Sequence, residues 1–316
     1  MTDADPQTPF LEGRITEVHP SHYIVKTDEG PYRCTLRGKL QEENADLVRP
    51  AAAGDYVDIT VSSKKEGAIE RIHDRSNKIS RPAPRSPNKE QIIAANVDLM
   101  IGLQAFKEPE FTPTLLDHSL AAAEQFDLPE QLICFNKMDL VDDPVRARDH
   151  LPDYEDIGYP VLHTSAIEPR NLDRLRQLMQ KKTTVLVGPS GSGKTSLLNA
   201  LNPELDLDVG ELGSRTKKGT HRTSSMTLHP LGPDTYGIDT PGVNFLSLWE
   251  CDFEQVQYHY PDIYQIRRNC SFDDCVHLKE PGCAVKQAVD ENELHPLRYE
   301  SYSSAVEKLK DEQLHE

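Results

Sequence analysis

The sequence lacks a long apolar run, and no stretch approaches the roughly 18 consecutive apolar residues that a membrane-spanning helix needs. Its first residues, 1–9, are polar and acidic, without the positive start and apolar stretch of a secretory signal. Cysteine is scarce, with six among 316 residues, which argues against a disulfide-stapled secreted domain. These absences indicate a globular chain with a cytoplasmic location and no membrane partner.

Positive charge is also in deficit, because 35 Lys and Arg residues face 52 Asp and Glu residues and leave a net charge of −17. An acidic surface repels phosphate, so a protein that coats nucleic acid non-specifically is excluded. One strip over residues 71–89 departs from this balance, with Asp74 as its only carboxylate. It is either a solvated connector or a phosphate-contacting surface, and its cations are Arg71, Arg75, Lys78, Arg81, Arg85 and Lys89.

The first part of the chain, residues 10–75, predicts a small β-barrel. A turn signal at 28–30 separates two of its β-rich runs. Five short strands in about 60 residues suit an OB-fold, although a barrel of another type stays possible. The runs are 13–18, 23–27, 32–36, 56–61 and 68–72. Three prolines in residues 76–90 then predict a basic linker.

From residue 91 the pattern changes to alternating apolar runs and helical segments. Residues 97–103 form a continuous apolar run, as expected of a strand that is buried on both faces. The alternation predicts a parallel sheet covered by helices over 91–248, followed by a mainly helical module over 249–316. The other predicted strands are 131–135, 159–163 and 183–187, and the predicted helices are 115–126, 172–180, 196–201 and 297–314.

A glycine-rich loop follows the strand at 183–187 and matches the phosphate-binding pattern G-x-x-x-x-G-K-[ST] in full. Its glycines let backbone N–H groups face phosphate oxygens, Lys194 reaches the β- and γ-phosphates, and Thr195 offers a hydroxyl to Mg²⁺. Such a loop fits ATPases and kinases as well as GTPases, so it does not name the base. The predicted nucleotide contacts are Gly188, Pro189, Ser190, Gly191, Ser192, Gly193, Lys194, Thr195 and Ser196.

The base is indicated by N-K-M-D at residues 136–139, directly after the strand at 131–135. The Asp139 carboxylate can accept from both N1–H and N2–H₂ of guanine, whereas adenine would leave it buried and unpaired. Asn136 would tie the loop to its neighbours, and the Lys137 stem would cover the base. Both this loop and the next follow strands, where ligands of open α/β sheets bind. The second loop is Thr164, Ser165 and Ala166, whose alanine N–H would donate to guanine O6.

Residues 239–242 read D-T-P-G, which places the Asp239 carboxylate near the Mg²⁺ shell and the Gly242 N–H at the γ-phosphate. No glutamine follows Gly242 to orient the attacking water. A basic, hydroxyl-rich segment at 214–225 suits a switch loop. There we expect Thr223, with Thr220 as the alternative, to complete the Mg²⁺ shell and His221 to orient water.

Four residues near the C-terminus are spaced C-x₄-C-x-H-x₅-C: Cys270, Cys275, His277 and Cys283. Three thiolates and one imidazole suit a tetrahedral Zn²⁺ site, although this spacing alone leaves an incidental cluster open. Cys251, His259 and His295 are the rival ligands.

The order of these motifs is rotated, because the base-reading loops precede the phosphate-binding loop. With these motifs and this order the chain resembles the circularly permuted bacterial ribosome-assembly GTPases, in particular the ribosome small subunit-dependent GTPase A family. The resemblance covers nearly the whole chain. It implies an OB-fold before the GTPase domain, GTP, GDP and Mg²⁺ as ligands, one Zn²⁺ on the four residues above, and a catalytic His221.

The resemblance also implies hydrolysis of GTP late in maturation of the 30S subunit, contact with its 16S rRNA and stimulation by that subunit. Nothing in the sequence suggests an obligate dimer, so we expect a monomer. The family's switch loop usually reads G-R-H-T-T-T, whereas residues 219–224 read G-T-H-R-T-S, so the histidine is kept and the arginine has moved. Two other functions fit the motifs less well: a metabolic P-loop kinase, and a nucleotide-gated RNA-binding module with little hydrolysis. We also expect residues 243–250 to pass the nucleotide state to the zinc module.

Overall fold

The computed structural model describes residues 10–84, 86–143, 151–208, 226–239 and 244–314. Contacts divide the chain into two compact units. The first contains residues 1–98, 181–185 and 215–242, and the second contains 99–180, 186–214 and 243–316. Within the described ranges, no helix has the length and apolar character needed to cross a bilayer.

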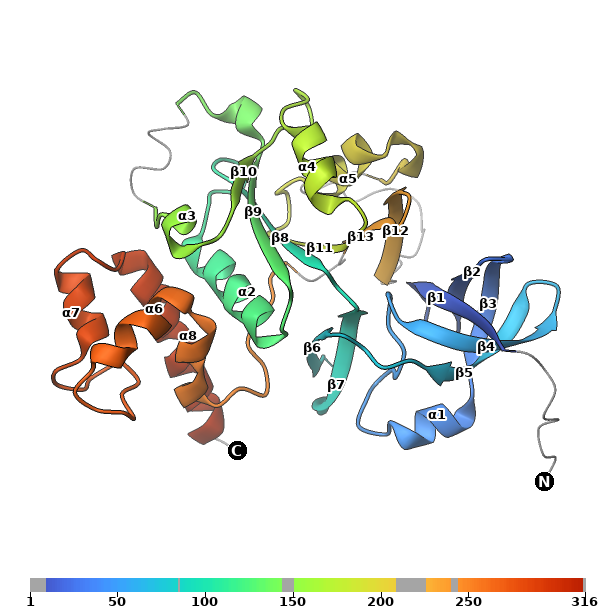
Figure 1. The fold of residues 1–316 in the computed structure, drawn as a ribbon, viewed down its shortest axis with the longest axis horizontal. Helices are drawn as coiled ribbons and strands as arrows, with labels where there is room; N and C mark the ends of the chain where they lie inside the picture. The colour runs from blue at the N-terminus through green and yellow to red at the C-terminus, as the bar shows by residue number, and fades with distance from the viewer. Residues whose placement is uncertain (1–9, 85, 144–150, 209–225, 240–243, 315–316) are drawn as a thin grey trace. The chain divides into compact units, whose positions relative to one another are not determined.

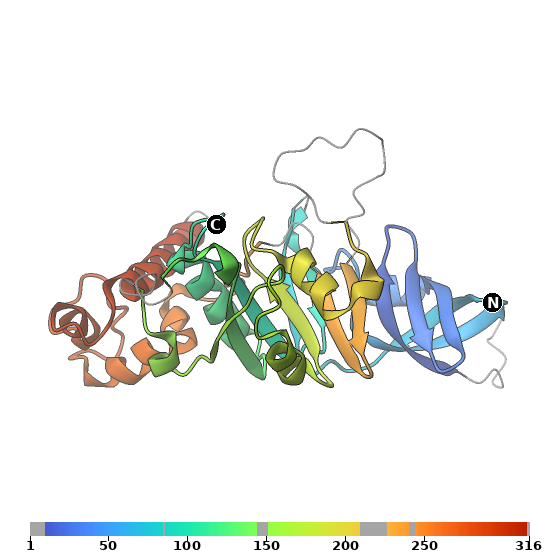
Figure 2. The ribbon, with the colours of Figure 1, turned by 90° about the horizontal axis from the view of Figure 1, so that it is seen from above.

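A closed five-stranded barrel begins the first unit, in shades of blue in Figures 1 and 2. β1 pairs with both β2 and β4, and the ring runs β1-β2-β3-β5-β4. The helix α1 (Gly38–Glu43) lies between the third and fourth strands in sequence. This confirms the predicted OB-type barrel. The strands are β1 (Leu11–Val18), β2 (Tyr23–Thr27), β3 (Gly30–Leu36), β4 (Tyr56–Ser63) and β5 (Glu66–Ile72).

The range that predicts a linker, 76–90, is instead mostly strand. β6 (Lys78–Ala83) and β7 (Ser86–Ala95) form an antiparallel two-stranded sheet. Prolines are tolerated there because each strand of a two-stranded sheet has an outer edge that needs no N–H donor. The prolines interrupt the alternating pattern that would otherwise have predicted a strand.

Half of the cations in the basic strip at 71–89 have carboxylate partners within the chain. Arg75 forms a two-pronged ion pair with the buried Asp55, at 2.7 Å for each nitrogen. Arg71 lies 3.5 Å from Asp58, and Lys78 is paired with Glu90. Three of the six cations of the strip thus have carboxylate partners within the chain, and contact of the strip with phosphate stays a prediction. The remaining part of the first unit is the hairpin β12 (Met226–Gly232) and β13 (Thr235–Asp239), whose β12 pairs with β1.

The second unit contains the parallel sheet that the apolar runs predict. β8 (Leu99–Ala105) is buried along its whole length and lies between β9 (Glu130–Asn136) and β11 (Thr183–Val187). β9 pairs in parallel with β8 and with β10 (Val161–His163). The strand β11 is shared between the units, since Lys181–Val185 belongs to the first and Leu186 onward to the second.

Helices of the second unit cover the sheet and build the C-terminal module. α2 (Pro113–Gln125) packs against β8 and also against η3 and α8 (Figure 1). A buried cluster of apolar residues that includes Tyr260, Tyr302 and Val306 forms the core of the module. The other elements are η1 (Met138–Leu140), α3 (Tyr154–Ile157), α4 (Leu172–Met179), α5 (Lys194–Leu201), η2 (Pro203–Leu205), η3 (Phe253–His259), α6 (Pro261–Ile266), η4 (Arg267–Asn269), α7 (Ala284–Asp290) and α8 (Pro296–Leu314).

Candidate functional site

The phosphate-binding loop joins β11 to α5, as its sequence pattern requires. Gly193 has φ +94°, a backbone conformation that favours glycine. A Cβ atom there would clash with the Asn136 side chain, and one on Gly188 would clash with the Leu103 carbonyl. The loop therefore needs glycine at both positions, because neighbouring chain fills the space that a side chain would take.

Polar groups of this loop are arranged for an anionic ligand. Lys194, the first residue of α5, donates to the carbonyl oxygens of Gly188 and Pro189 at 2.6 and 3.2 Å. The Ser192 hydroxyl is buried without a hydrogen-bond partner within the described residues. Thr195 and Ser196 lie half-buried in the first turn of the helix. A glycine cradle, an ammonium group and an orphaned hydroxyl fit nucleotide phosphates with Mg²⁺.

Asn136 links three loops: the two that the sequence predicts to bind the base, and the phosphate-binding loop. Its side chain is 1% exposed. Its Nδ2 donates to the Ser192 carbonyl at 3.0 Å, and its Oδ1 accepts from the Thr164 hydroxyl at 3.1 Å. The Thr164 carbonyl in turn accepts from the Met138 N–H at 3.1 Å. One buried amide thus holds the three segments in register.

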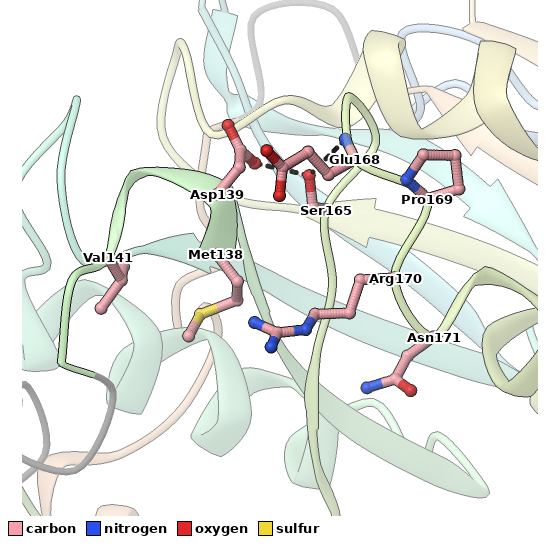
Figure 3. A pocket seen from close by; sticks show the side chains of 8 residues that line it. All are labelled: Met138, Asp139, Val141, Ser165, Glu168, Pro169, Arg170 and Asn171. Carbon is pink, nitrogen blue, oxygen red and sulfur yellow. Dashed lines mark hydrogen bonds between the residues drawn. The ribbon is translucent and has the colours of Figure 1, made fainter.

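Asp139 and Ser165 meet at the edge of a cavity of about 730 Å³. The Ser165 hydroxyl donates to the Asp139 carboxylate, and the Glu168 N–H donates to that hydroxyl (Figure 3). Met138, buried and apolar, lines the same cavity. A half-buried carboxylate beside an apolar side chain can accept two donors from a flat heterocycle, as guanine requires.

Two other predicted base contacts, Lys137 and Ala166, do not line this cavity. Lys137 has φ +59°, and its ammonium donates to the Glu108 carbonyl at 2.6 Å. Ala166 does not line the cavity but a neighbouring hollow that also contains Arg174 and Arg176.

Several side chains that line this cavity were not predicted from the sequence. These side chains come from the segment between β10 and α4, and only their position directly after T-S-A could have signalled them. They are Glu168, Pro169, Arg170 and Asn171.

The residues predicted to act in hydrolysis fall mostly outside the described part of the chain. This applies to His221, Thr220, Thr223 and Gly242. Asp239 is the last residue of β13, where its backbone pairs with Thr227 of β12. The predictions for these residues stay predictions.

The four predicted zinc ligands come together in the C-terminal module. Their ligand atoms all lie within 4.8 Å of one another, and no other such group of His, Cys, Asp or Glu occurs among the described residues. The His277 Nδ1 atom lies 3.5, 3.3 and 3.4 Å from the Sγ atoms of Cys270, Cys275 and Cys283. With Zn–S bonds of about 2.3 Å, such a cluster fits one tetrahedral Zn²⁺. The rivals Cys251, His259 and His295 are not part of it.

Burial acts in opposite ways on the imidazole and the thiols of this cluster. It lowers the pKa of His277 to about 4, so that the imidazole is neutral near pH 7. It also raises the pKa of Cys275 to about 12, so a metal must displace thiol protons when it binds. The module supports the ligand segment through α8, whose Tyr299 and Tyr302 hydroxyls donate to the carbonyls of His277 and Val276.

The segment after D-T-P-G is fastened to α2. The Leu246 N–H donates to the Ser119 hydroxyl at 3.1 Å. The Gln125 side chain forms two hydrogen bonds with the Trp249 backbone: it donates to the carbonyl at 2.6 Å and accepts from the N–H at 3.1 Å. Residues 246–249 are therefore held against one helix of the GTPase domain, while their predicted role in passing on the nucleotide state stays a prediction.

A buried ion pair also links α2 to the C-terminal module. Arg298 of α8 is fully buried and donates to Asp117 of α2 at 2.7 Å. It also donates to both carboxylate oxygens of Asp262, at 3.0 and 3.2 Å, and lies over the Tyr260 ring. Burial opposes the charge of Arg298, but the two carboxylates outweigh it and raise the pKa of the guanidinium.

Comparisons with known proteins agree with this geometry. The family model "RsgA GTPase" matches residues 72–249, and the model "RsgA N-terminal domain" matches residues 12–69. The small ribosomal subunit biogenesis GTPase RsgA of Bacteroides fragilis is 34% identical over 300 residues, covering 94% of this chain and 96% of that protein. The protein of the same name from Bacillus cereus is 33% identical over 302 residues, covering 95% and 98%.

Solved structures give the same result. YloQ, described as a circularly permuted GTPase, is 32% identical with a TM-score of 0.71 and covers 98% of this chain and 99% of its own. YjeQ from Thermotoga maritima is 29% identical with a TM-score of 0.74, covering 95% and 99%. With its rotated motifs, its barrel and its Cys₃His cluster, the chain belongs to the RsgA family of circularly permuted GTPases.

Proposed function

We propose that this GTPase acts on the small ribosomal subunit, hydrolysing GTP to GDP and phosphate during late maturation of the 30S particle. Its relatives carry the name small ribosomal subunit biogenesis GTPase. The observation that best supports guanine-dependent switching is the buried Asn136 amide, which fastens the base-reading loops to the phosphate-binding loop. This link would fix the position of a base bound at Asp139 relative to phosphates bound at Lys194.

The residue roles follow from the chemistry of each group. Backbone N–H groups of 188–196 and the Lys194 ammonium would bind the phosphates, while Asp139 and the Thr164–Ala166 loop would bind guanine. The Thr195 hydroxyl would hold Mg²⁺, which would supply charge neutralisation to the phosphates. Asp239 and Gly242 would respond to the metal and the γ-phosphate. Thr223 and His221 would complete the metal shell and orient water.

The proposed division of labour has four parts. Residues 10–75 form the OB-fold barrel, 76–90 connect it, 91–248 bind and hydrolyse GTP, and 249–316 form the zinc-binding domain. We propose that the protein is a cytoplasmic monomer with no membrane partner that contacts 16S rRNA. The cations of the 71–89 strip, Arg81 and Arg85 among them, would contact the RNA phosphates.

Turnover measured with and without small subunits tests this function. We expect slow hydrolysis alone and a large increase with 30S subunits, while 50S subunits serve as the control particle. The His221→Ala variant should lose the stimulated rate and keep GTP binding. A rate that small subunits leave unchanged would contradict the proposal, and binding to them without any turnover would favour a nucleotide-gated RNA-binding module.

A further inference from the structure

One guanidinium group of the barrel is a meeting point of several segments of the first unit. Arg14 lies on β1, and its Nη2 donates to the Thr183 hydroxyl of β11 at 2.6 Å. Its other hydrogen bonds go to the carbonyl oxygens of Gly54 and Asn96, at 3.2 and 3.4 Å. These acceptors are uncharged, so the planar fork of the arginine holds its place through directed hydrogen bonds.

Two tyrosine rings contact the same guanidinium group. Its Cζ atom lies 4.9 Å from the centroid of the Tyr56 ring of β4 and 5.2 Å from that of the Tyr236 ring of β13. Arg14 therefore contacts β11 through a hydrogen bond and β13 through a ring face. Arg14, Thr183 and both tyrosines belong to the first unit and line one cavity of about 830 Å³.

These contacts lie at the starting ends of two strands whose other ends lead into the nucleotide loops. Thr183 is the first residue of β11, and the phosphate-binding loop follows that strand. Tyr236 is the second residue of β13, which ends at Asp239 of D-T-P-G. The two starting ends are also joined to each other, because the Tyr236 N–H donates to the Lys182 carbonyl at 2.9 Å. A shift of either strand along its axis would therefore move groups that hold the guanidinium.

Thr183 is fixed on its backbone side as well. Its N–H donates to the Asp98 carboxylate at 2.7 Å, and its carbonyl accepts from the Asp98 N–H at 2.8 Å. The residue is 2% exposed. Because Thr183 is held in this way, its hydroxyl follows the position of β11, and the bond to Arg14 links that position to β1.

We propose that Arg14 couples the barrel to the nucleotide loops, as a positioning residue that acts on β11 and β13. The γ-phosphate distinguishes GTP from GDP, and it would contact the loops at the ends of both strands. Its loss would change how these strands lie against β1, and the barrel would respond through the guanidinium group. The assignment of D-T-P-G to the γ-phosphate rests on the proposed function.

Hydrogen exchange in the zinc-loaded full-length protein measures this coupling. Peptides that cover β1 of the unmodified chain should exchange differently with GDP and with a non-hydrolysable GTP analogue. Arg14→Met keeps an apolar stem but removes the fork, and it should abolish most of this difference. Arg37→Met is the matched control and should keep it, since Arg37 pairs with Glu70 inside the barrel, at 2.7 Å. An unmodified chain without the difference, or an Arg14→Met chain that keeps it, overturns the inference.

Variants of Thr183 test the same bond from its other end. Thr183→Val has nearly the same shape but lacks the hydroxyl, so it should reproduce the loss seen in Arg14→Met. Thr183→Ser keeps the hydroxyl and should restore the response. A Thr183→Val chain that responds like the unmodified chain overturns the role of this bond.

Nucleotide affinity separates coupling from general support of the fold. Arg14→Met should bind the GTP analogue roughly fivefold more weakly, because a contact that favours the GTP-bound arrangement is lost. Its affinity for GDP should stay within about twofold of the unmodified value. If binding of GDP falls as much as binding of the analogue, Arg14 only supports the fold and the inference is overturned.

Turnover with small subunits separates this inference from the proposed function. At saturating GTP, Arg14→Met should keep the unstimulated rate and lose about tenfold of the stimulation by 30S subunits. Stimulation equal to that of the unmodified chain overturns the inference. If 30S subunits do not stimulate the unmodified chain, the proposed function fails, and the hydrogen-exchange comparison still decides the inference.

Discussion

Replacing Arg298 by methionine should destabilise the second unit strongly. Methionine fills a similar apolar volume but removes three charge-assisted hydrogen bonds, one to Asp117 and two to Asp262. The Asp117 side chain is 0% exposed, so its charge would remain buried without its cation. Breaking a buried pair in this way costs about 3–5 kcal/mol.

Trp249 provides the measurement, because it is the only tryptophan and its backbone is bound to Gln125 of α2. Its emission should report loss of the packing between α2 and the C-terminal module during urea unfolding of the zinc-loaded chain. With a urea dependence of roughly 1–3 kcal/mol per molar, the midpoint should fall by about 1 M or more.

Two control variants assign the cause of this loss. Lys308→Met removes an exposed cation from the same helix, 3.9 Å from Glu312, and should change stability by less than about 1 kcal/mol. The double variant Arg298→Met with Asp117→Leu should recover stability relative to Arg298→Met, because the fully buried carboxylate of Asp117 is removed and the remaining one, Asp262, is 12% exposed. The reasoning is refuted if Arg298→Met unfolds at the same midpoint as Lys308→Met, or if the double variant is no better than the single one.

Three other outcomes test the nucleotide and metal sites. Asp139→Asn should weaken GTP binding roughly 100-fold or more and favour XTP, whose base has an acceptor in place of the guanine amino group. Competition of GTP and XTP against a labelled nucleotide would measure both effects. An unchanged preference for GTP would place base recognition elsewhere. Cys283→Ser should lower the zinc content after dialysis against a chelator, and a retained ion would remove Cys283 from the ligand set. Ser119→Ala should speed hydrogen exchange at Leu246, whose buried N–H loses its acceptor; equal exchange would show that this bond does not fasten the segment.

The parts of the fold that the sequence predicts are those encoded by short local patterns. β8 and β11 were predictable because burial on both faces demands continuous apolar runs. The phosphate-binding loop and N-K-M-D were predictable because each places its groups within eight residues. The hairpin of β6 and β7 escaped prediction because its prolines and cations resemble those of a connector. Only the structure shows that Lys78 of β6 pairs with Glu90 of β7.

The groups that sequence reasoning missed act through partners far along the chain. Asp117 and Arg298 are separated by 181 positions, and neither stands in a recognisable motif. Gln257 lies 20 positions before His277 and is an ordinary glutamine until the fold brings its amide to the imidazole. Such pairs carry no local signal, because only the tertiary structure determines which buried polar groups must satisfy each other.

The rotated motif order gives α2 a role that the usual order would not. In the rotated order, D-T-P-G directly precedes the C-terminal module. The segment that follows it contacts α2 before the module begins, through hydrogen bonds to Ser119 and Gln125. Asp117 of the same helix holds Arg298 of the module from its buried side. If residues 243–250 pass the nucleotide state to the zinc module, as we propose, a displacement along this segment would act on a helix that is already bound to the module. This favours transmission of the nucleotide state as a shift of the whole module with α2 rather than as local melting of residues 244–250, since local melting would leave the N–H of Leu246 and both amide contacts of Gln125 without partners.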